Sequence, residues 1–183
     1  MKTRRKLLIV DGYNVLRSGS RYRGFVDPDY TDDSFNRARE ALMEDVVVFA
    51  GSAYEAIIVF DGAGNAFSTG EAQKNGGVSV MFSPAGSSAD KVIEKLARDA
   101  RERAVETLVV TSDATIQDTV FGGGVNRMSA DGFSREIEAY YEDARLDDSP
   151  KVAHKNTVSG RIDEQTLAKL IALRDGTSRG GKS

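Results

Sequence analysis

The chain has 183 residues, of which 40% are hydrophobic and 29% charged, a balance typical of a globular protein rather than a disordered or membrane one. It contains no cysteine and a single histidine, His154, which excludes disulfides, zinc ribbons, thiol catalysis and two-histidine hydrolysis within one chain. The net charge of −3 argues against binding nucleic acid through bulk charge alone.

No apolar run approaches the ~20 residues that a membrane span needs. The start of the chain is basic, but only four apolar residues follow before Asp11, too few for the core of a signal peptide. We therefore expect a cytoplasmic protein with no membrane partner.

Short apolar runs with β-branched residues alternate with amphipathic segments along most of the chain. The runs predict strands at residues 7–10, 55–60, 78–82, 107–111 and 126–129, the last at a sheet edge. The amphipathic segments predict helices at residues 33–50, 88–104, 114–121 and 133–146. This alternation indicates an α/β fold, a three-layer sandwich around a mostly parallel five-stranded sheet.

Residues 17–32 connect the first strand to the first of these helices and alternate arginines with aromatic residues. Such alternation suits contact with a nucleic-acid backbone and stacking on bases. A solvated loop whose aromatic side chains pack on the core is an equal alternative.

The composition changes after residue 147, where Asp147-Asp148-Ser149-Pro150 breaks the preceding helix. We expect residues 1–147 to form the domain, and residues 148–183 to form a linker, an amphipathic helix near 163–174 and a disordered tail.

Four aspartates are predicted to meet at one edge of the sheet. Asp11, Asp61 and Asp113 each follow a predicted strand, and Asp90 opens the helix after another. Because parallel strands end at the same edge, where α/β proteins bind ligands, these carboxylates should gather in one crevice.

Each aspartate also has an ordinary explanation. Asp11-Gly12 and Asp61-Gly62 are common turn pairs, Asp113 could cap a helix, and Asp90 could complete a capping box with Ser87. Together, however, strand ends only ~4.8 Å apart bring the charges close enough to repel and to raise at least one pKa. Mg²⁺ or Mn²⁺ would relieve the repulsion and leave positions for phosphate oxygens and an attacking water, which fits phosphodiester hydrolysis.

Other phosphate chemistries fit less well. No strand is followed by a Gly-x-x-x-x-Gly-Lys-Ser/Thr loop, and the glycines at 122–124 follow a helix instead of opening one. A phosphotransferase with an aspartyl intermediate would usually carry a second aspartate at position 13, which is Tyr13.

Four segments in this order resemble the NYN branch of the PIN-like metal-dependent ribonucleases, within it the bacterial YacP-type family. The resemblance covers roughly residues 6–146 and is carried by Val10-Asp11-Gly12-Tyr13-Asn14, Phe60-Asp61, Ser88-Ala89-Asp90-Lys91-Val92-Ile93-Glu94 and Thr111-Ser112-Asp113-Ala114-Thr115-Ile116-Gln117. It implies the strand order 3-2-1-4-5 and metal-dependent endonucleolytic cleavage of RNA, specifically of mRNA on the translating ribosome, with no action on DNA.

By position, Asp11, Asp90 and Asp113 match the acidic metal site of that family, and Asn14 matches its motif asparagine, which would orient Asp11 or the phosphate. Asp61 is a plausible fourth acid at a less regular position. Glu94, one helical turn beyond Asp90, could reach a second metal or pair with Arg98 on the surface.

Three functions stay open at this point. The first is an Mg²⁺- or Mn²⁺-dependent endoribonuclease. The second is a catalytically silent adaptor that binds RNA or the ribosome, and the third is a phosphohydrolase acting on small molecules.

Overall fold

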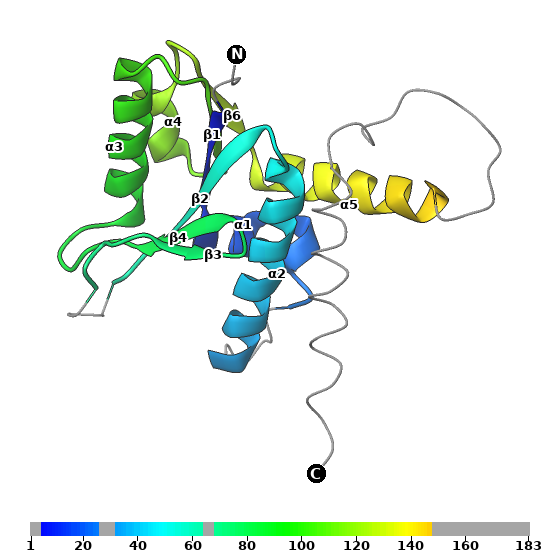
Figure 1. Cartoon of the computed structure of the whole chain (residues 1–183). Coiled ribbons are helices and arrows are strands. Elements are labelled where there is room, and N and C mark those ends of the chain that lie inside the picture. Colours follow the sequence, from blue (N-terminus) through cyan, green and yellow to red (C-terminus); the bar gives the residue numbers. More distant parts are fainter. Residues whose placement is uncertain (1–4, 26–31, 64–67, 148–183) are drawn as a thin grey trace.

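The computed structural model describes residues 5–25, 32–63 and 68–147 (Figure 1). The helix expected at 163–174, the tail and His154 lie outside the described residues.

The described part of the chain is built on one twisted sheet in the order β3-β4-β2-β1-β5-β6. All neighbouring strands run parallel except β3, which is antiparallel to β4. The strands are β1 (Lys6–Asp11), β2 (Tyr54–Phe60), β3 (Gln73–Asn75), β4 (Val78–Phe82), β5 (Thr107–Val110) and β6 (Val125–Met128). The five expected strands therefore take the order 3-2-1-4-5, and the α/β class is confirmed.

Within the described residues, six helical segments accompany the sheet and complete three layers (Figure 1). They are α1 (Gly12–Ser18), the 3₁₀ turn η1 (Ser20–Tyr22), α2 (Asp32–Ala50), α3 (Ala89–Glu102), α4 (Ala114–Val120) and α5 (Ala130–Asp147). Helices α3 and α4 cover one face, and α1, α2 and α5 cover the other.

Alternation along the central strands explains the two-sided core. Leu8 and Val10 of β1 pack with α1, α2 and α5, whereas Ile9 between them packs with α3 and α4. All three side chains are fully buried, as expected for a strand covered on both faces.

Three expectations from the sequence are corrected. A sixth strand, β3, pairs with β4 in a segment where the sequence predicts no strand. Helix α1 begins directly at Gly12, so Asp11-Gly12 ends a strand and opens a helix without an intervening turn. The last described helix begins at Ala130, three residues before the expected start, because polar residues in its first turn mask the apolar periodicity.

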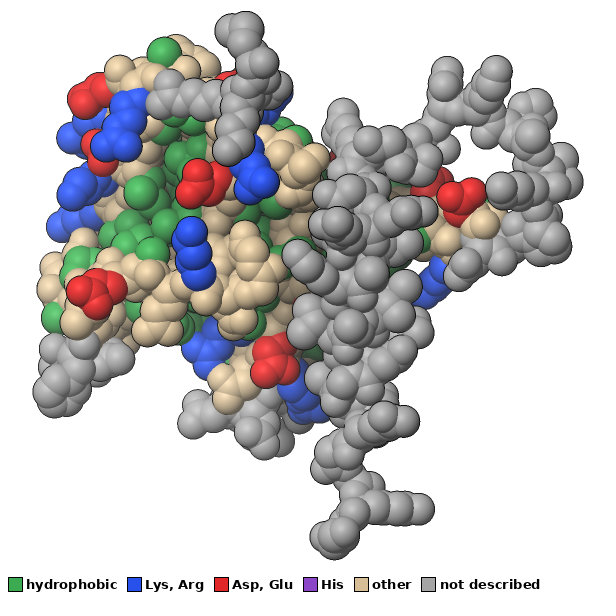
Figure 2. All heavy atoms as spheres, in the orientation of Figure 1, with side chains coloured by type: hydrophobic (Ala, Val, Ile, Leu, Met, Phe, Trp, Pro, Cys, Tyr) green, Lys and Arg blue, Asp and Glu red, His purple; other side chains and the backbone are tan. Residues whose placement is uncertain are grey.

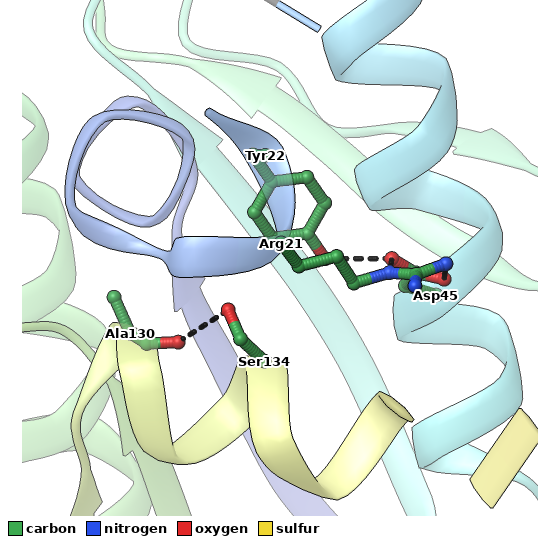
Figure 3. Close-up of polar contacts among 5 residues, drawn as sticks. All are labelled: Arg21, Tyr22, Asp45, Ala130 and Ser134. Carbon is green, nitrogen blue, oxygen red and sulfur yellow. Dashed lines mark hydrogen bonds and ion pairs between the residues drawn. The ribbon is translucent and has the colours of Figure 1, made fainter. Parts of the chain in front are cut away.

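Residues 20–22, within the segment rich in arginine and aromatic residues, form a partly buried ion pair with α2 (Figure 3). The Arg21 guanidinium donates to both Asp45 carboxylate oxygens, at 2.6 and 3.1 Å, and the Tyr22 hydroxyl donates to the same carboxylate at 2.8 Å. Asp45 is 1% exposed and Tyr22 fully buried, so these contacts fasten η1 to α2. For Tyr22, the interpretation that the aromatic side chains of residues 17–32 pack on the core is correct.

A second buried hydrogen bond in Figure 3 lies within α5, where the Ser134 hydroxyl donates to the Ala130 carbonyl at 3.0 Å.

Within the described ranges, no helix has the length and apolar character that crossing a bilayer would require.

Candidate active site

Asp11 is the most buried of the candidate acids, with 6% of its surface exposed. The Thr111 hydroxyl donates to its Oδ2 at 3.0 Å. The backbone N–H of Asn14 also faces the carboxylate, outside the geometry of a full capping bond. Burial outweighs these two favourable contacts and raises the pKa of Asp11 to about 6, with smaller contributions from the charges of Asp90 and Asp113.

Asp113 lies across the β1–β5 pair from Asp11. Its Oδ1 accepts hydrogen bonds from both the backbone N–H and the hydroxyl of Thr115, at 2.8 and 2.7 Å, so it caps α4. These bonds lower the pKa of the Asp113 carboxyl. No hydrogen bond within the described residues reaches its Oδ2, which leaves that oxygen available to a ligand.

Asn14 connects the two strand ends that carry Asp11 and Asp113. Its side-chain oxygen accepts a hydrogen bond of 2.7 Å from the backbone N–H of Ser112. The contact joins α1 to the turn between β5 and α4, so Asn14 holds the backbone beside Asp113.

Asp61 is connected in the same way to the turn after β4. Its Oδ1 accepts from the backbone N–H of Ala63 at 2.9 Å and from the fully buried Ser83 hydroxyl at 3.3 Å. The Ser83 oxygen in turn accepts the backbone N–H of Gly62 at 2.9 Å. Ser83 therefore stabilises the end of β2 against the segment that leads to Asp90.

Asp90 lies in the first turn of α3. The helix is capped by Ser88, whose hydroxyl oxygen accepts from the backbone N–H of Lys91 at 3.4 Å, so the expected capping box of Ser87 with Asp90 is wrong. Burial and the charges of Asp113, Asp61 and Glu94 raise the pKa of Asp90. The four aspartates lie at or after the carboxyl ends of the parallel strands β1, β2, β4 and β5, so all four lie at one edge of the sheet.

The carboxylate oxygens of the four aspartates are chemically suited to bind a hard divalent cation. Carboxylate oxygens are the ligands that Mg²⁺ and Mn²⁺ prefer, and no lysine or arginine of the described chain forms an ion pair with any of the four aspartates. Within the described residues, no three acidic side chains lie close enough together to hold a metal ion as they stand. One reason is that the Asp113 carboxylate is hydrogen-bonded to Thr115.

Two residues at this edge were not singled out from the sequence. Thr111 is fully buried and bridges Asp11 and the backbone N–H of Asp113, which donates to its hydroxyl oxygen at 3.1 Å. Ser83 performs the corresponding role at Asp61. The sequence signal that could have identified Thr111 and Ser83 is a hydroxyl residue directly after an apolar strand, here β5 and β4.

The outer side of α3 mixes basic and acidic side chains, which Figure 2 shows at that end of the molecule. The outer surface of α3 is therefore not uniformly positive.

Comparison with known proteins shows which family the chain belongs to. The profile of the YacP-like NYN domain matches residues 8–175. The chain belongs to the YacP-like NYN domain family. An uncharacterised YacP protein of Bacillus subtilis is 33% identical over 132 residues, which cover 72% of this chain and 75% of the relative.

Two crystal structures of Rae1 (YacP) from Bacillus subtilis, one of them of a variant, share the fold of this YacP-like NYN protein at 28% identity. The variant has a TM-score of 0.63, with 91% of this chain and 99% of that one covered. The other has a TM-score of 0.56, with 94% and 90% covered. NYN domains belong to the PIN-like nucleases, so the chain carries a domain of nuclease type.

Proposed function

We propose that this YacP-like NYN protein is a Mg²⁺- or Mn²⁺-dependent endoribonuclease that hydrolyses phosphodiester bonds of mRNA on the translating ribosome, in the cytoplasm. The observation that carries the proposal is the group of four aspartates at the carboxyl edge of the sheet. There, burial and mutual repulsion raise the pKa of Asp11 and Asp90. A polyanionic substrate can approach such an edge only when cations compensate the carboxylates.

Asp11, Asp90 and Asp113 would hold the cation through their carboxylate oxygens. When bound, the cation supplies neutralisation of charge on the phosphate and activation of water. Thr111 fixes the orientation of the Asp11 carboxylate, and Asn14 holds the turn that carries Asp113. Asp61 restrains the β4–α3 segment through Ser83, and it contributes negative charge next to Asp90.

The acidic net charge of the chain is the reason for including the ribosome in the proposal. A net charge of −3 makes free RNA a weak ligand at physiological salt, because binding driven by phosphate contacts requires clustered lysine and arginine. A partner that presents the RNA would remove this limitation. Cleavage of RNA on ribosomes should accordingly be faster than cleavage of the same RNA free in solution.

The test compares 5′-end maps of cellular RNA from cells that express wild-type protein, Asp90→Asn or Asp99→Asn. Asp99 lies on the same helix as Asp90, more than two turns further from the acidic edge, so its amide variant is the matched control. We expect new 5′-phosphate ends with wild-type and Asp99→Asn protein and their loss with Asp90→Asn.

The proposal fails if Asp90→Asn, shown to be folded by its thermal unfolding, generates the same ends as wild type. Ribosome co-sedimentation without any new ends in all three strains would instead indicate an adaptor. Turnover of mononucleotides or sugar phosphates, lost in Asp90→Asn, would indicate a small-molecule phosphohydrolase.

A further inference from the structure

A row of aromatic rings lies beside the acidic edge, on the face of the sheet that α2 covers. Phe60 and Phe82 are register partners at the ends of β2 and β4, and their rings stack with centroids 5.5 Å apart and planes at 28°. Tyr13 of α1 continues the row, with its centroid 5.0 Å from that of Phe60. The row immediately precedes Asp61 and Ser83 in the two strands.

The outer member of this row is open to solvent. Phe82 is 37% exposed, whereas its neighbour Phe60 is 1% exposed. An apolar ring at the end of a sheet strand gains nothing from contact with water, and burial in the core would be favourable. Phe82 instead presents part of an aromatic surface one residue away from Ser83, which bonds to Asp61.

Two arginines border the row. The guanidinium carbon of Arg39 lies 5.9 Å from the Phe82 ring centroid, and that of Arg17 lies 5.8 Å from the Tyr13 ring centroid. Arg39 also donates to the Asn36 side-chain oxygen. Neither arginine forms an ion pair with a carboxylate in the portion of the chain that the structure describes, so both keep their charge available for phosphate.

Arginine side chains over aromatic rings, next to a group of carboxylates, indicate one class of ligand. Single-stranded nucleic acid binds by stacking its bases on aromatic side chains while arginines contact its phosphates. In a duplex, the base faces are stacked on one another and cannot reach Phe82. The arginines would also offset the repulsion between the RNA backbone and the aspartates.

We propose that Phe82, with Arg39 and the Phe60–Tyr13 row behind it, is a stacking subsite for a base of single-stranded RNA, adjacent to the phosphate at the acidic edge. The inference rests on the proposed nuclease function for the identity of the nucleic acid. It adds that the substrate is unpaired at the nucleotide next to the cleaved bond.

The test measures binding separately from cleavage, so that the two proposals can fail separately. Binding of a fluorescent single-stranded RNA of about 12 nucleotides is followed by anisotropy at low salt, in an Asp90→Asn background that prevents turnover. Phe82→Leu keeps an apolar contact with Phe60 but removes the aromatic face. Phe82→Trp enlarges that face, and Leu146→Ala removes an exposed apolar side chain on α5 as the control.

We expect Phe82→Leu to weaken binding of the single strand about tenfold, Phe82→Trp to match or exceed the parent, and Leu146→Ala to leave binding unchanged. Arg39→Ala should weaken binding and reduce its salt dependence by about one counterion. A 5-iodouridine in the RNA should crosslink to the peptide that contains Phe82. In active protein, Phe82→Leu should raise KM for cleavage of a single-stranded RNA and leave kcat nearly unchanged.

Equal affinity of Phe82→Leu and its parent for the single strand would overturn the subsite. So would an equal loss of affinity for a matched duplex, since stacking cannot account for it. Either result leaves the comparison of wild type with Asp90→Asn, and hence the nuclease proposal, unaffected. Conversely, normal binding effects with no cleavage by active protein would retain the subsite and reject the nuclease.

Discussion

The hydroxyl of Thr111 donates a hydrogen bond of 3.0 Å to Asp11 Oδ2, between two residues that are 100 positions apart in the chain and both buried. The same hydroxyl oxygen accepts the backbone N–H of Asp113 at 3.1 Å. One side chain thus orients the central carboxylate and supports the backbone of its neighbour. The bond favours the ionised form of Asp11, yet burial still raises the pKa of this carboxyl to about 6.

The raised pKa makes Asp11 destabilising at neutral pH in protein freed of metal. Below the ordinary value of 3.8, Asp11 is protonated in both the folded and unfolded states. Between 3.8 and about 6 the unfolded chain loses the proton that the folded state keeps, so the stability from Asp11 is lost as pH rises through this window. Asp11→Asn avoids this loss. At pH values above this window, its free energy of unfolding should exceed that of wild type by up to about 3 kcal/mol.

Urea unfolding of both proteins in EDTA, across the same pH range, measures this difference. Carboxylates away from this edge of the sheet affect both proteins alike and cancel in the comparison. A difference that is constant with pH, or that grows toward acid, would show that Asp11 is not buried in its charged form.

Divalent cations should reverse this penalty. Mg²⁺ or Mn²⁺ that binds the folded state alone stabilises it by about 2.7 kcal/mol when present at about 100 times its Kd. We expect the melting temperature of wild type and Asp99→Asn to rise on addition of Mn²⁺, and that of Asp11→Asn and Asp90→Asn to rise little. Sodium chloride at matched ionic strength is the reference, and equal shifts in all four proteins would argue against a site at these aspartates.

Gly12 packs directly against the ring of Phe60. A Cβ at residue 12 would lie 2.3 Å from Phe60 Cε1, and that ring is confined between Tyr13 and Phe82. Gly12→Ala should therefore cost about 1–3 kcal/mol of stability, although alanine is otherwise the better helix residue.

Gly24→Ala provides the matched control for Gly12→Ala, since nothing lies within 4 Å of a Cβ there, and it should be neutral or slightly stabilising. Denaturant unfolding measures both variants. The double variant Gly12→Ala with Phe60→Leu should lose less stability than the sum of the two single changes, because the smaller side chain makes room. Additive losses would contradict the contact.

The Tyr22 hydroxyl holds the buried carboxylate of Asp45, which is not one of the four candidate acids. Tyr22→Phe removes its 2.8 Å bond to Asp45 but keeps the ring in the core, so the unfolding free energy should fall by about 1.5–3 kcal/mol. Tyr140→Phe, on partly exposed α5, should change the unfolding free energy by less than about 0.5 kcal/mol. RNA cleavage measured well below the melting temperature should be equal in both, and a selective loss in Tyr22→Phe would give this residue a role in the site.

Local periodicity determined the layers of this protein and the location of its candidate site. Apolar runs with β-branched residues such as Leu7-Leu8-Ile9-Val10, each followed by a turn or helix signal, favour strands covered on both faces. Once the strands are parallel, the aspartates that follow them must share one edge. The α/β class and the joint location of Asp11, Asp61, Asp90 and Asp113 were accessible at this level, because both depend only on residue type and short-range spacing.

Only the tertiary structure decided how these residues are held. Strand β3 consists of Gln73-Lys74-Asn75, which are all exposed, and it exists only because β4 offers backbone partners. Thr111 and Asp11, Arg21 and Asp45, and Phe82 and Arg39 meet across separate elements, and nothing in either partner's local sequence specifies the other. The pKa of Asp11 depends on a core assembled from distant segments, because desolvation is a property of the packed fold and not of the residue.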